Sequence, residues 1–278
     1  MQAFSFTPGW AFPTGTLGEL TRAAHTRAEH VAARLNELRA RAVDVNAPPA
    51  FDVNLRGDAL RVIAEVKRAS PSKGAINPGI DAAEQAARYV EGGAAAISVL
   101  TEPTRFGGSL DDLAGVAARV RVPVIRKDFL VHPVQLWEAR ALGAAAVLLI
   151  VRALSPSELP LLMDTARACG LAALVEVRDE AELERALAVE ATVIGVNNRN
   201  LETLVIDPMT APGLIPQIPA RCFAIAESGM RAAADVVPAA QAGADAILVG
   251  SAVSAAHDPA DAVRALSAIA RVQSSARV

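Results

Sequence analysis

The runs AAAVLLI at residues 144–150 and AALVEV at residues 172–177 decide the fold, because the chain around them repeats their pattern. Each run is almost continuously apolar, which is typical of a parallel strand covered by protein on both faces. Similar runs occupy residues 62–67, 95–100, 122–127, 193–197, 222–228 and 246–250. Consecutive runs end between 20 and 33 residues apart, which leaves room for a loop and a helix each time. The sequence therefore predicts eight strand-helix units.

The segments between these runs carry residues that start and end helices. A cap residue stands three positions before a carboxylate in the pairs Asp81/Glu84, Ser109/Asp112, Ser155/Glu158 and Asp179/Glu182, and Pro156 reinforces the third. Glycines that suit a left-handed helix end precede the next strand at Gly92, Gly93, Gly143, Gly170 and Gly243. Eight units predict a (β/α)8 TIM barrel. A doubly wound sheet is the alternative, but VIAEVKRASPSKG at residues 62–74 lacks its GxGxxG turn.

Composition excludes several classes of protein. The chain has 278 residues, of which 52% are hydrophobic, so it can bury a large core. Its 27 basic residues face 30 acidic ones, giving a net charge of −3 without a dense cationic stripe, and we expect no nucleic-acid partner. The longest apolar stretch, residues 141–151, is well short of the ~20 residues of a membrane helix. We therefore expect no membrane span.

The amino terminus and the two cysteines predict a cytoplasmic protein. The first residues, MQAFSFTPGWAFPTG, lack the basic and apolar regions of a secretory signal. Cys169 and Cys222 have no CxxC or CxxH spacing, which argues against a disulfide framework and a metal site. We interpret both as small apolar residues in a reducing compartment.

The amino-terminal part stands outside the strand-helix repeat. Thr16 and Glu19 form a capping pattern, which predicts one extra helix over residues 17–42. Residues 43–58, with Pro48 and Pro49, are expected to form a connector. We expect the helix to pack against the barrel, because an isolated helix is marginal in water. The prediction is one barrel domain over residues 1–278, with residues 1–58 as its helical extension and connector.

Charged and polar residues stand at the ends of the predicted strands. They are Glu65, Lys67, Lys127, Glu176, Asn197 and Glu227. An ion in a dry interior costs several kcal/mol unless it is paired. One interpretation is an internal ion-pair network, with Glu65 on Lys127 and Lys67 on Glu176. However, all these residues lie at the carboxyl ends of strands, where barrel enzymes build their active sites, so a catalytic site is favoured.

A phosphate site is predicted beside these charges. Ser228 and Gly229 follow the seventh strand, and Gly250 and Ser251 follow the eighth. Loops at these two positions often hold phosphate in barrels, because glycines let backbone N–H groups approach an anion. Ser70 in the first loop would complete this site. Two further residues, Phe106 and Phe129, are candidates for the apolar wall of an aromatic substrate, although core packing is an equal alternative.

Together these residues resemble the indole-3-glycerol-phosphate synthase family over about residues 62–253. The matching motifs are IAEVKRASPSKG, SVLTEPTRFGGSL, PVIRKDFLVHPVQLWEARALGA, LVEV, IGVNNRNL, AESGM and GADAILVGSA. The resemblance implies ring closure of a carboxyphenylamino-deoxyribulose phosphate to indole-3-glycerol phosphate in tryptophan biosynthesis. Carbon dioxide and water are released, and neither metal nor organic cofactor is implied.

The resemblance also implies roles for individual residues. Lys127 would be the general acid acting on the substrate ketone during ring closure. Glu176 and Glu65 would remove protons and stabilise the cation. Lys67 would contact the substrate carboxylate and protonate the departing hydroxyl.

Other positions match residues of the family that bind or orient substrate. Asn197 and Arg199 correspond to polar positioning residues, and Ser228 corresponds to a substrate contact near Glu227. The implied phosphate-binding residues are Ser70, Ser228, Gly229, Gly250 and Ser251. The implied apolar pocket consists of Phe106, Phe129 and Leu201.

Three alternatives to a lyase are left open by the residues themselves. An isomerase resembling phosphoribosylanthranilate isomerase would share the phosphate loops, but Cys222 begins its strand instead of ending it. An aldolase would form a Schiff base on Lys127 or Lys67. A barrel that binds a phosphorylated ligand without turnover is the non-enzymatic alternative. We expect a phosphorylated small molecule as partner, and a monomer or homodimer.

Overall fold

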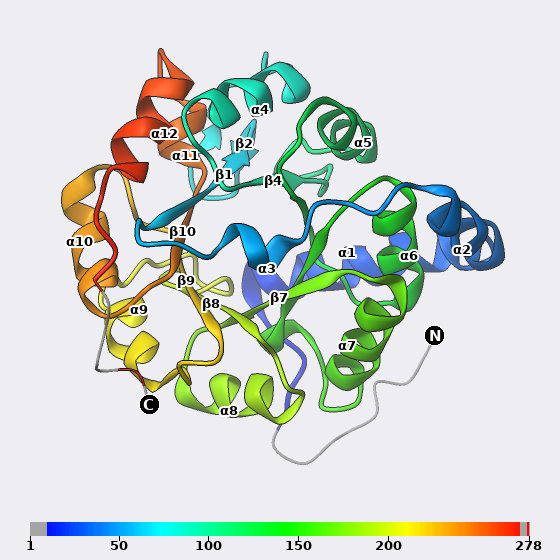
Figure 1. Ribbon diagram of the computed structural model, residues 1–278. Coiled ribbons are helices and arrows are strands. Elements are labelled where there is room, and N and C mark those ends of the chain that lie inside the picture. Colours follow the sequence, from blue (N-terminus) through cyan, green and yellow to red (C-terminus); the bar gives the residue numbers. More distant parts are fainter. Residues whose placement is uncertain (1–9, 273–276, 278) are drawn as a thin grey trace.

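The computed structural model describes residues 10–272 and residue 277, and its core is a closed barrel of eight parallel strands (Figure 1). The strands follow one another around the ring in chain order, and the first closes against the last. They are β1 (Arg61–Val66), β4 (Ala96–Leu100), β5 (Val124–Lys127), β6 (Ala146–Ile150), β7 (Ala172–Val177), β8 (Val193–Asn197), β9 (Phe223–Glu227) and β10 (Ala246–Val249). The predicted TIM barrel is confirmed.

A ring of helices covers the outside of this barrel (Figure 1). Between strands lie α4 (Ala82–Glu91), α5 (Leu110–Arg119), α6 (Pro133–Ala141), α7 (Glu158–Cys169), α8 (Glu180–Ala188), α9 (Thr210–Leu214) and α10 (Ala233–Gln241). After β10 come α11 (Ser251–Ser254) and α12 (Pro259–Ser267). Two short 3-10 helices are η1 (Val151–Ala153) and η2 (Ile215–Gln217). None of the helices within the described ranges is long and apolar enough to cross a membrane.

All eight predicted runs form strands, with boundaries that agree within two residues. Their side chains are almost entirely buried, as in β4, β6 and β8. The reason is that helices cover the outer face while side chains fill the barrel interior. The predicted caps Asp81, Ser109 and Asp179 each accept a hydrogen bond from the backbone three residues later.

The expected start of α7 is wrong by two residues. This helix begins at Glu158 with Ser157 as its N-cap, so Pro156 is not its first residue. Ser155 and Glu158 still bond reciprocally, because Ser155 Oγ accepts the Glu158 N–H at 3.3 Å and Glu158 Oε2 accepts the Ser155 N–H at 2.7 Å. The two bonds between Ser155 and Glu158 therefore stabilise the turn that precedes the helix.

The amino-terminal extension contains two long helices instead of the one expected over residues 17–42. These are α1 (Gly15–Ala32) and α2 (Leu35–Asp44), separated by a turn at residues 33–34. Thr16 lies inside α1, whose N-cap is Thr14, so the predicted capping pattern is wrong. The connector contains the short α3 (Phe51–Asn54). As expected, the extension packs on the barrel, and Leu17, Leu20 and Ala24 are buried in its core.

The first loop of the barrel, which follows the carboxyl end of β1, forms a small hairpin. Strands β2 (Ala69–Ser70) and β3 (Gly74–Ala75) pair antiparallel, so Ser70 faces Gly74. Ser70 Oγ accepts the Lys73 N–H at 3.2 Å, which stabilises the turn. This hairpin brings Ser70 over the end of β1.

The contribution of the N-cap of α4 to stability can be tested by mutation. Asp81→Ala removes the acceptor of the Glu84 N–H bond, which measures 2.9 Å, and leaves that donor to solvent. We expect a loss of about 1 kcal/mol in the free energy of unfolding, and a thermal midpoint lower by about 2 °C. Asp81→Asn keeps an acceptor and should stay near wild type. Equal midpoints for the alanine variant and wild type in calorimetry would contradict this role of the cap.

Candidate active site

A hollow at the carboxyl end of the barrel gathers most of the predicted site residues. Its volume is about 720 Å³ including the open mouth. Of the predicted residues, it is lined by Glu65, Lys67, Ser70, Phe106, Lys127, Phe129, Glu176, Asn197, Arg199, Leu201, Ser228 and Ser251. Glu227, Gly229 and Gly250 are not among the lining residues. Side chains from all eight barrel strands or their following loops therefore converge here, and those of every strand except β6 include predicted residues.

Lys127 is the centre of the charged floor. Its Nζ atom lies 3.9 Å from Glu65 Oε2, 3.8 Å from Glu176 Oε2 and 3.6 Å from Glu227 Oε2. Burial alone would lower the pKa of Lys127, but the surrounding carboxylates, Glu227 foremost, outweigh it and raise the pKa above its ordinary value. The ammonium group is therefore charged throughout the neutral range and points its positive charge into the hollow.

Lys67 pairs with Glu65 on the adjoining part of the floor. Its Nζ donates a hydrogen bond to Glu65 Oε1 at 2.8 Å. Burial would raise the pKa of Glu65, but the ammonium groups of Lys67 and Lys127 hold it below its usual value. The pairing of Lys67 with Glu176, one half of the network considered from the sequence, does not occur among the ion pairs of the described residues. Glu65 instead connects both lysines.

Glu227 and Glu176 carry unusually placed carboxyl groups. Both oxygens of Glu227 and Oε2 of Glu176 are buried without a hydrogen-bond partner. Burial raises the pKa of Glu227 to about 8, and the nearby Glu176 carboxylate adds to the rise. Gly195 leaves space for this group, since a Cβ there would collide with Glu227 Oε1. At neutral pH, Glu227 is mainly a protonated acid beneath the cavity floor.

Two aromatic rings form one wall of the hollow. The centroids of Phe106 and Phe129 lie 6.3 Å apart with an interplanar angle of 41°, and Lys67 Nζ is 5.7 Å from the Phe106 centroid. Both rings line the cavity instead of serving only as core packing, and Leu201 adds apolar surface. This arrangement offers an aromatic surface beside a cation, which suits an aryl group that bears a carboxylate.

Hydroxyl groups lie at another part of the hollow. Ser70, Ser228 and Ser251 come from the first, seventh and eighth loops and line the same cavity. Ser228 and Gly229 have left-handed backbone conformations, with φ of +65° and +86°. This bend turns the chain sharply at the end of β9. The three hydroxyls can donate hydrogen bonds to an oxyanion such as phosphate.

Asn197 and Arg199 are fixed by bonds within their own loop. Asn197 Oδ1 accepts the Arg199 N–H at 2.9 Å, and Arg199 Nη1 donates to the Leu204 carbonyl at 2.9 Å. Burial lowers the pKa of Arg199 from its ordinary value. Both side chains border the hollow, so they are placed to orient a bound molecule.

A family model places this arrangement among known proteins. The model described as indole-3-glycerol phosphate synthase matches residues 20–266. The chain belongs to the indole-3-glycerol phosphate synthase family. It is 54% identical over 231 residues to indole-3-glycerol phosphate synthase 1 of Streptomyces coelicolor, covering 82% of this chain and 85% of the relative. It is 48% identical over 240 residues to the Mycolicibacterium gilvum synthase, covering 86% and 88%.

Solved structures outside this family show the same fold. The 3-hexulose-6-phosphate synthase from Salmonella typhimurium superposes with a TM-score of 0.61 at 16% sequence identity, covering 75% of this chain and 97% of that one. At such low identity the likeness concerns the barrel alone, since one fold hosts many chemistries. The synthase family membership rests instead on the family model and the close relatives.

The cavity of this family member includes residues that the sequence did not single out. Thr16 and Leu20 of α1 border it, together with Pro71, Ser72, Leu100, Asp128, Leu148, Ile150 and Leu204. The contribution of α1 comes from tertiary packing, and no local motif indicates it. Leu100 and Ile150 are the last residues of β4 and β6, so the strand-end rule that selected the charged residues would also have found them.

A metal site is a separate question for this family member. Among the described residues, no group of three or more histidine, cysteine, aspartate or glutamate side chains is arranged to hold a metal ion. The carboxylates of the floor instead surround ammonium groups.

The pKa of Glu227 gives a test through protein stability. Its pKa is about 8 in the folded protein, against an ordinary value of 4.5. Between these values the folded state keeps a proton that the unfolded state has lost, so ionisation favours unfolding as the pH rises. We expect the thermal midpoint of Glu227→Gln to rise relative to wild type between pH 4.5 and 8, and the difference to level off above pH 8.

Glu19→Gln is the matched control for this series, because the Glu19 side chain is 58% exposed on α1. Its midpoint should run parallel to that of wild type across the pH range. A difference between Glu227→Gln and wild type that stays constant from pH 4.5 to 8 would contradict the raised pKa.

Proposed function

We propose that this protein catalyses the reaction for which its family is named, and that the residues of the charged floor carry it. The substrate would be 1-(2-carboxyphenylamino)-1-deoxyribulose 5-phosphate and the products indole-3-glycerol phosphate, carbon dioxide and water. The observation that supports this most directly is the Lys127 ammonium group, which lies within 4 Å of three carboxyl groups beside an aromatic wall.

The substrate has three parts that match three parts of the hollow. Its aryl ring would lie against Phe106 and Phe129, with the ring carboxylate near Lys67. Its phosphate would accept hydrogen bonds from the serine hydroxyls and from the backbone at Gly229 and Gly250. The ketone between these ends would then lie over Lys127. Binding both ends holds the aromatic carbon close to the ketone carbon, which lowers the entropic cost of ring closure.

Ring closure places negative charge on the ketone oxygen. The aromatic carbon attacks the ketone carbon, and Lys127 donates a hydrogen bond and a proton to the oxygen that becomes a hydroxyl. The ring is left as a cation, which Glu65 and Glu176 stabilise. Carbon dioxide then leaves from the ring carbon that made the attack, and the electrons of the broken bond restore the aromatic ring.

Dehydration completes the indole. Lys67 donates a proton to the departing hydroxyl, so that water leaves, and Glu176 removes the proton from the neighbouring carbon to form the new double bond. Asn197, Arg199 and Ser228 orient the intermediate, and Glu227 lies behind Lys127 as a group that tunes its charge. The scheme needs neither a metal nor an organic cofactor.

The partner in this proposal is a phosphorylated small molecule. The proposal requires one chain for each site, so a monomer and a homodimer both satisfy it. We place the reaction in the cytoplasm, and the whole chain from residue 1 to 278 acts as one barrel domain with an amino-terminal extension.

The direct experiment is turnover of the purified protein with the anilino-deoxyribulose phosphate, followed by the fluorescence of the indole product. We expect product between pH 6 and 9 from the wild type. No product in that range would overturn the proposed reaction and leave a phosphorylated-ligand binder. A borohydride-trapped adduct on Lys127 or Lys67 would favour the aldolase alternative instead.

Lys127→Ala tests the role of the central ammonium group. Loss of a general acid costs typically 10²- to 10⁴-fold, so we expect kcat to fall by at least about 10²-fold while substrate still binds. Lys73→Ala is the control, because Lys73 is an exposed residue of the first loop and does not line the cavity. A Lys127→Ala variant that folds and keeps a kcat near wild type would remove Lys127 from the acid role.

A further inference from the structure

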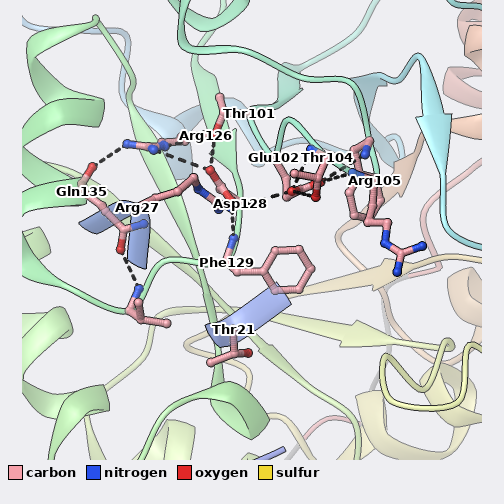
Figure 2. Close-up of polar contacts among 12 residues, drawn as sticks. Thr21, Arg27, Thr101, Glu102, Thr104, Arg105, Arg126, Asp128, Phe129 and Gln135 are labelled. Atoms are coloured by element: carbon pink, nitrogen blue, oxygen red, sulfur yellow. Dashed lines mark hydrogen bonds and ion pairs between the residues drawn. The ribbon is translucent and has the colours of Figure 1, made fainter. Parts of the chain in front are cut away.

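Arg27 of helix α1 bridges two buried carboxylates from different barrel loops. Its Nη2 donates to Asp128 Oδ1 at 2.8 Å, and its Nη1 lies 3.7 Å from Glu102 Oε1. Figure 2 shows Arg27 beside Asp128, with Glu102 on the neighbouring loop. The side chains of Asp128 and Glu102 are 1% and 0% exposed, whereas that of Arg27 is 29% exposed. Arg27 thus links the amino-terminal extension to two loops at the active end of the barrel.

Each of these carboxylates also holds the backbone of an aromatic wall residue. Asp128 Oδ1 accepts the N–H of Phe129 at 2.8 Å, and Glu102 Oε2 accepts the N–H of Phe106 at 3.1 Å. The two rings are the pair whose centroids lie 6.3 Å apart in the cavity. Arg27 therefore contacts both of the carboxylates that hold the backbone N–H groups of Phe106 and Phe129.

The rest of the network fixes the two carboxylates without joining them. Asp128 Oδ2 accepts from Thr101 Oγ1 at 2.7 Å and lies 3.6 Å from Arg126 Nη2. Glu102 accepts the backbone N–H groups of Thr104 and Arg105 at 2.9 and 2.7 Å, which folds its own loop (Figure 2). Within the part of the chain that the structure describes, Arg27 is the side chain that contacts both carboxylates.

We propose that Arg27 is a positioning residue that sets the separation of Phe106 and Phe129, and thereby the affinity for the aryl end of the substrate. This inference rests on the proposed function. Arg27 does not line the catalytic hollow, so it touches no substrate and acts through the two carboxylates. Lys127 keeps its own three carboxyl partners when Arg27 is removed, because none of them contacts Arg27.

The structure offers a matched control on the same helix and the same loop. Glu19 of α1 pairs with Arg105 at 3.1 Å, but these side chains are 58% and 55% exposed. An exposed ion pair contributes little, because solvent screens it and ordering two long side chains costs entropy. Glu19→Gln removes a link between α1 and this loop without disturbing a buried carboxylate.

The experiment compares steady-state kinetics of wild type, Arg27→Met, Arg27→Lys and Glu19→Gln, below the lowest thermal midpoint of the set. Met fills a similar space without charge. We expect Arg27→Met to raise KM about tenfold or more while kcat changes less than about threefold. Arg27→Lys should recover part of the affinity, and Glu19→Gln should match wild type. An unchanged KM in Arg27→Met, or a fall confined to kcat, would overturn the inference.

A second measurement separates positioning from a loss of stability. The rise in KM caused by Arg27→Met should shrink to less than about threefold when Phe106 and Phe129 are both already replaced by Leu, because coupled residues are not additive. A merely structural role would give the same ratio in both backgrounds. Turnover by the wild type separates the two hypotheses. If the wild type forms product and Arg27→Met has the same KM as wild type, this inference alone is wrong. If the wild type forms no product, the proposed function is wrong.

Discussion

The Lys127 ammonium group is buried among carboxyl groups, and the balance of charge around it constrains the whole active end of the barrel. An unpaired ion there would cost several kcal/mol. Lys127 and Lys67 supply two positive charges, whereas Glu65, Glu176 and Glu227 can supply three negative ones. Because the pKa of Glu227 is about 8, that group stays protonated near neutrality. A proton on Glu227 therefore reduces the excess of carboxylate charge around the two ammonium groups.

In the proposed function, the residues for the chemistry and those for recognition of the aryl group would lie on different parts of the fold. The charged floor stands on strand ends, whose positions are fixed by barrel hydrogen bonds, as in the register of Asn197 with Glu227. The aromatic wall stands on loops, which are tied down by buried carboxylates and by Arg27 of α1. Helix α1 therefore does more than cover apolar surface, since it borders the hollow and fixes the loops that form its wall.

The sequence predicted features with a local pattern and missed features that arise from packing. The eight strands follow from continuous apolar runs, and the floor follows from charges at their ends. The break between α1 and α2 was missed, because the Ala-Arg turn at residues 33–34 contains no glycine or proline. Lys67 was considered as a partner of Glu176, but it bonds to Glu65 on its own strand face, where residues two apart lie together. Arg27 has no local signal, since its partners lie 75 and 101 residues away.

Charge balance also orders the events of the proposed reaction. A substrate carboxylate near Lys67 would compete with Glu65 for the ammonium group, which now donates to Glu65 at 2.8 Å. Glu65 would keep Lys127 as its counterion, 3.9 Å away. When carbon dioxide leaves, the substrate carboxylate beside Lys67 would disappear, and this ammonium group could then donate its proton to the departing hydroxyl. In the proposed reaction, decarboxylation would thus prepare the acid for dehydration, because the same lysine would serve first as counterion and then as proton donor.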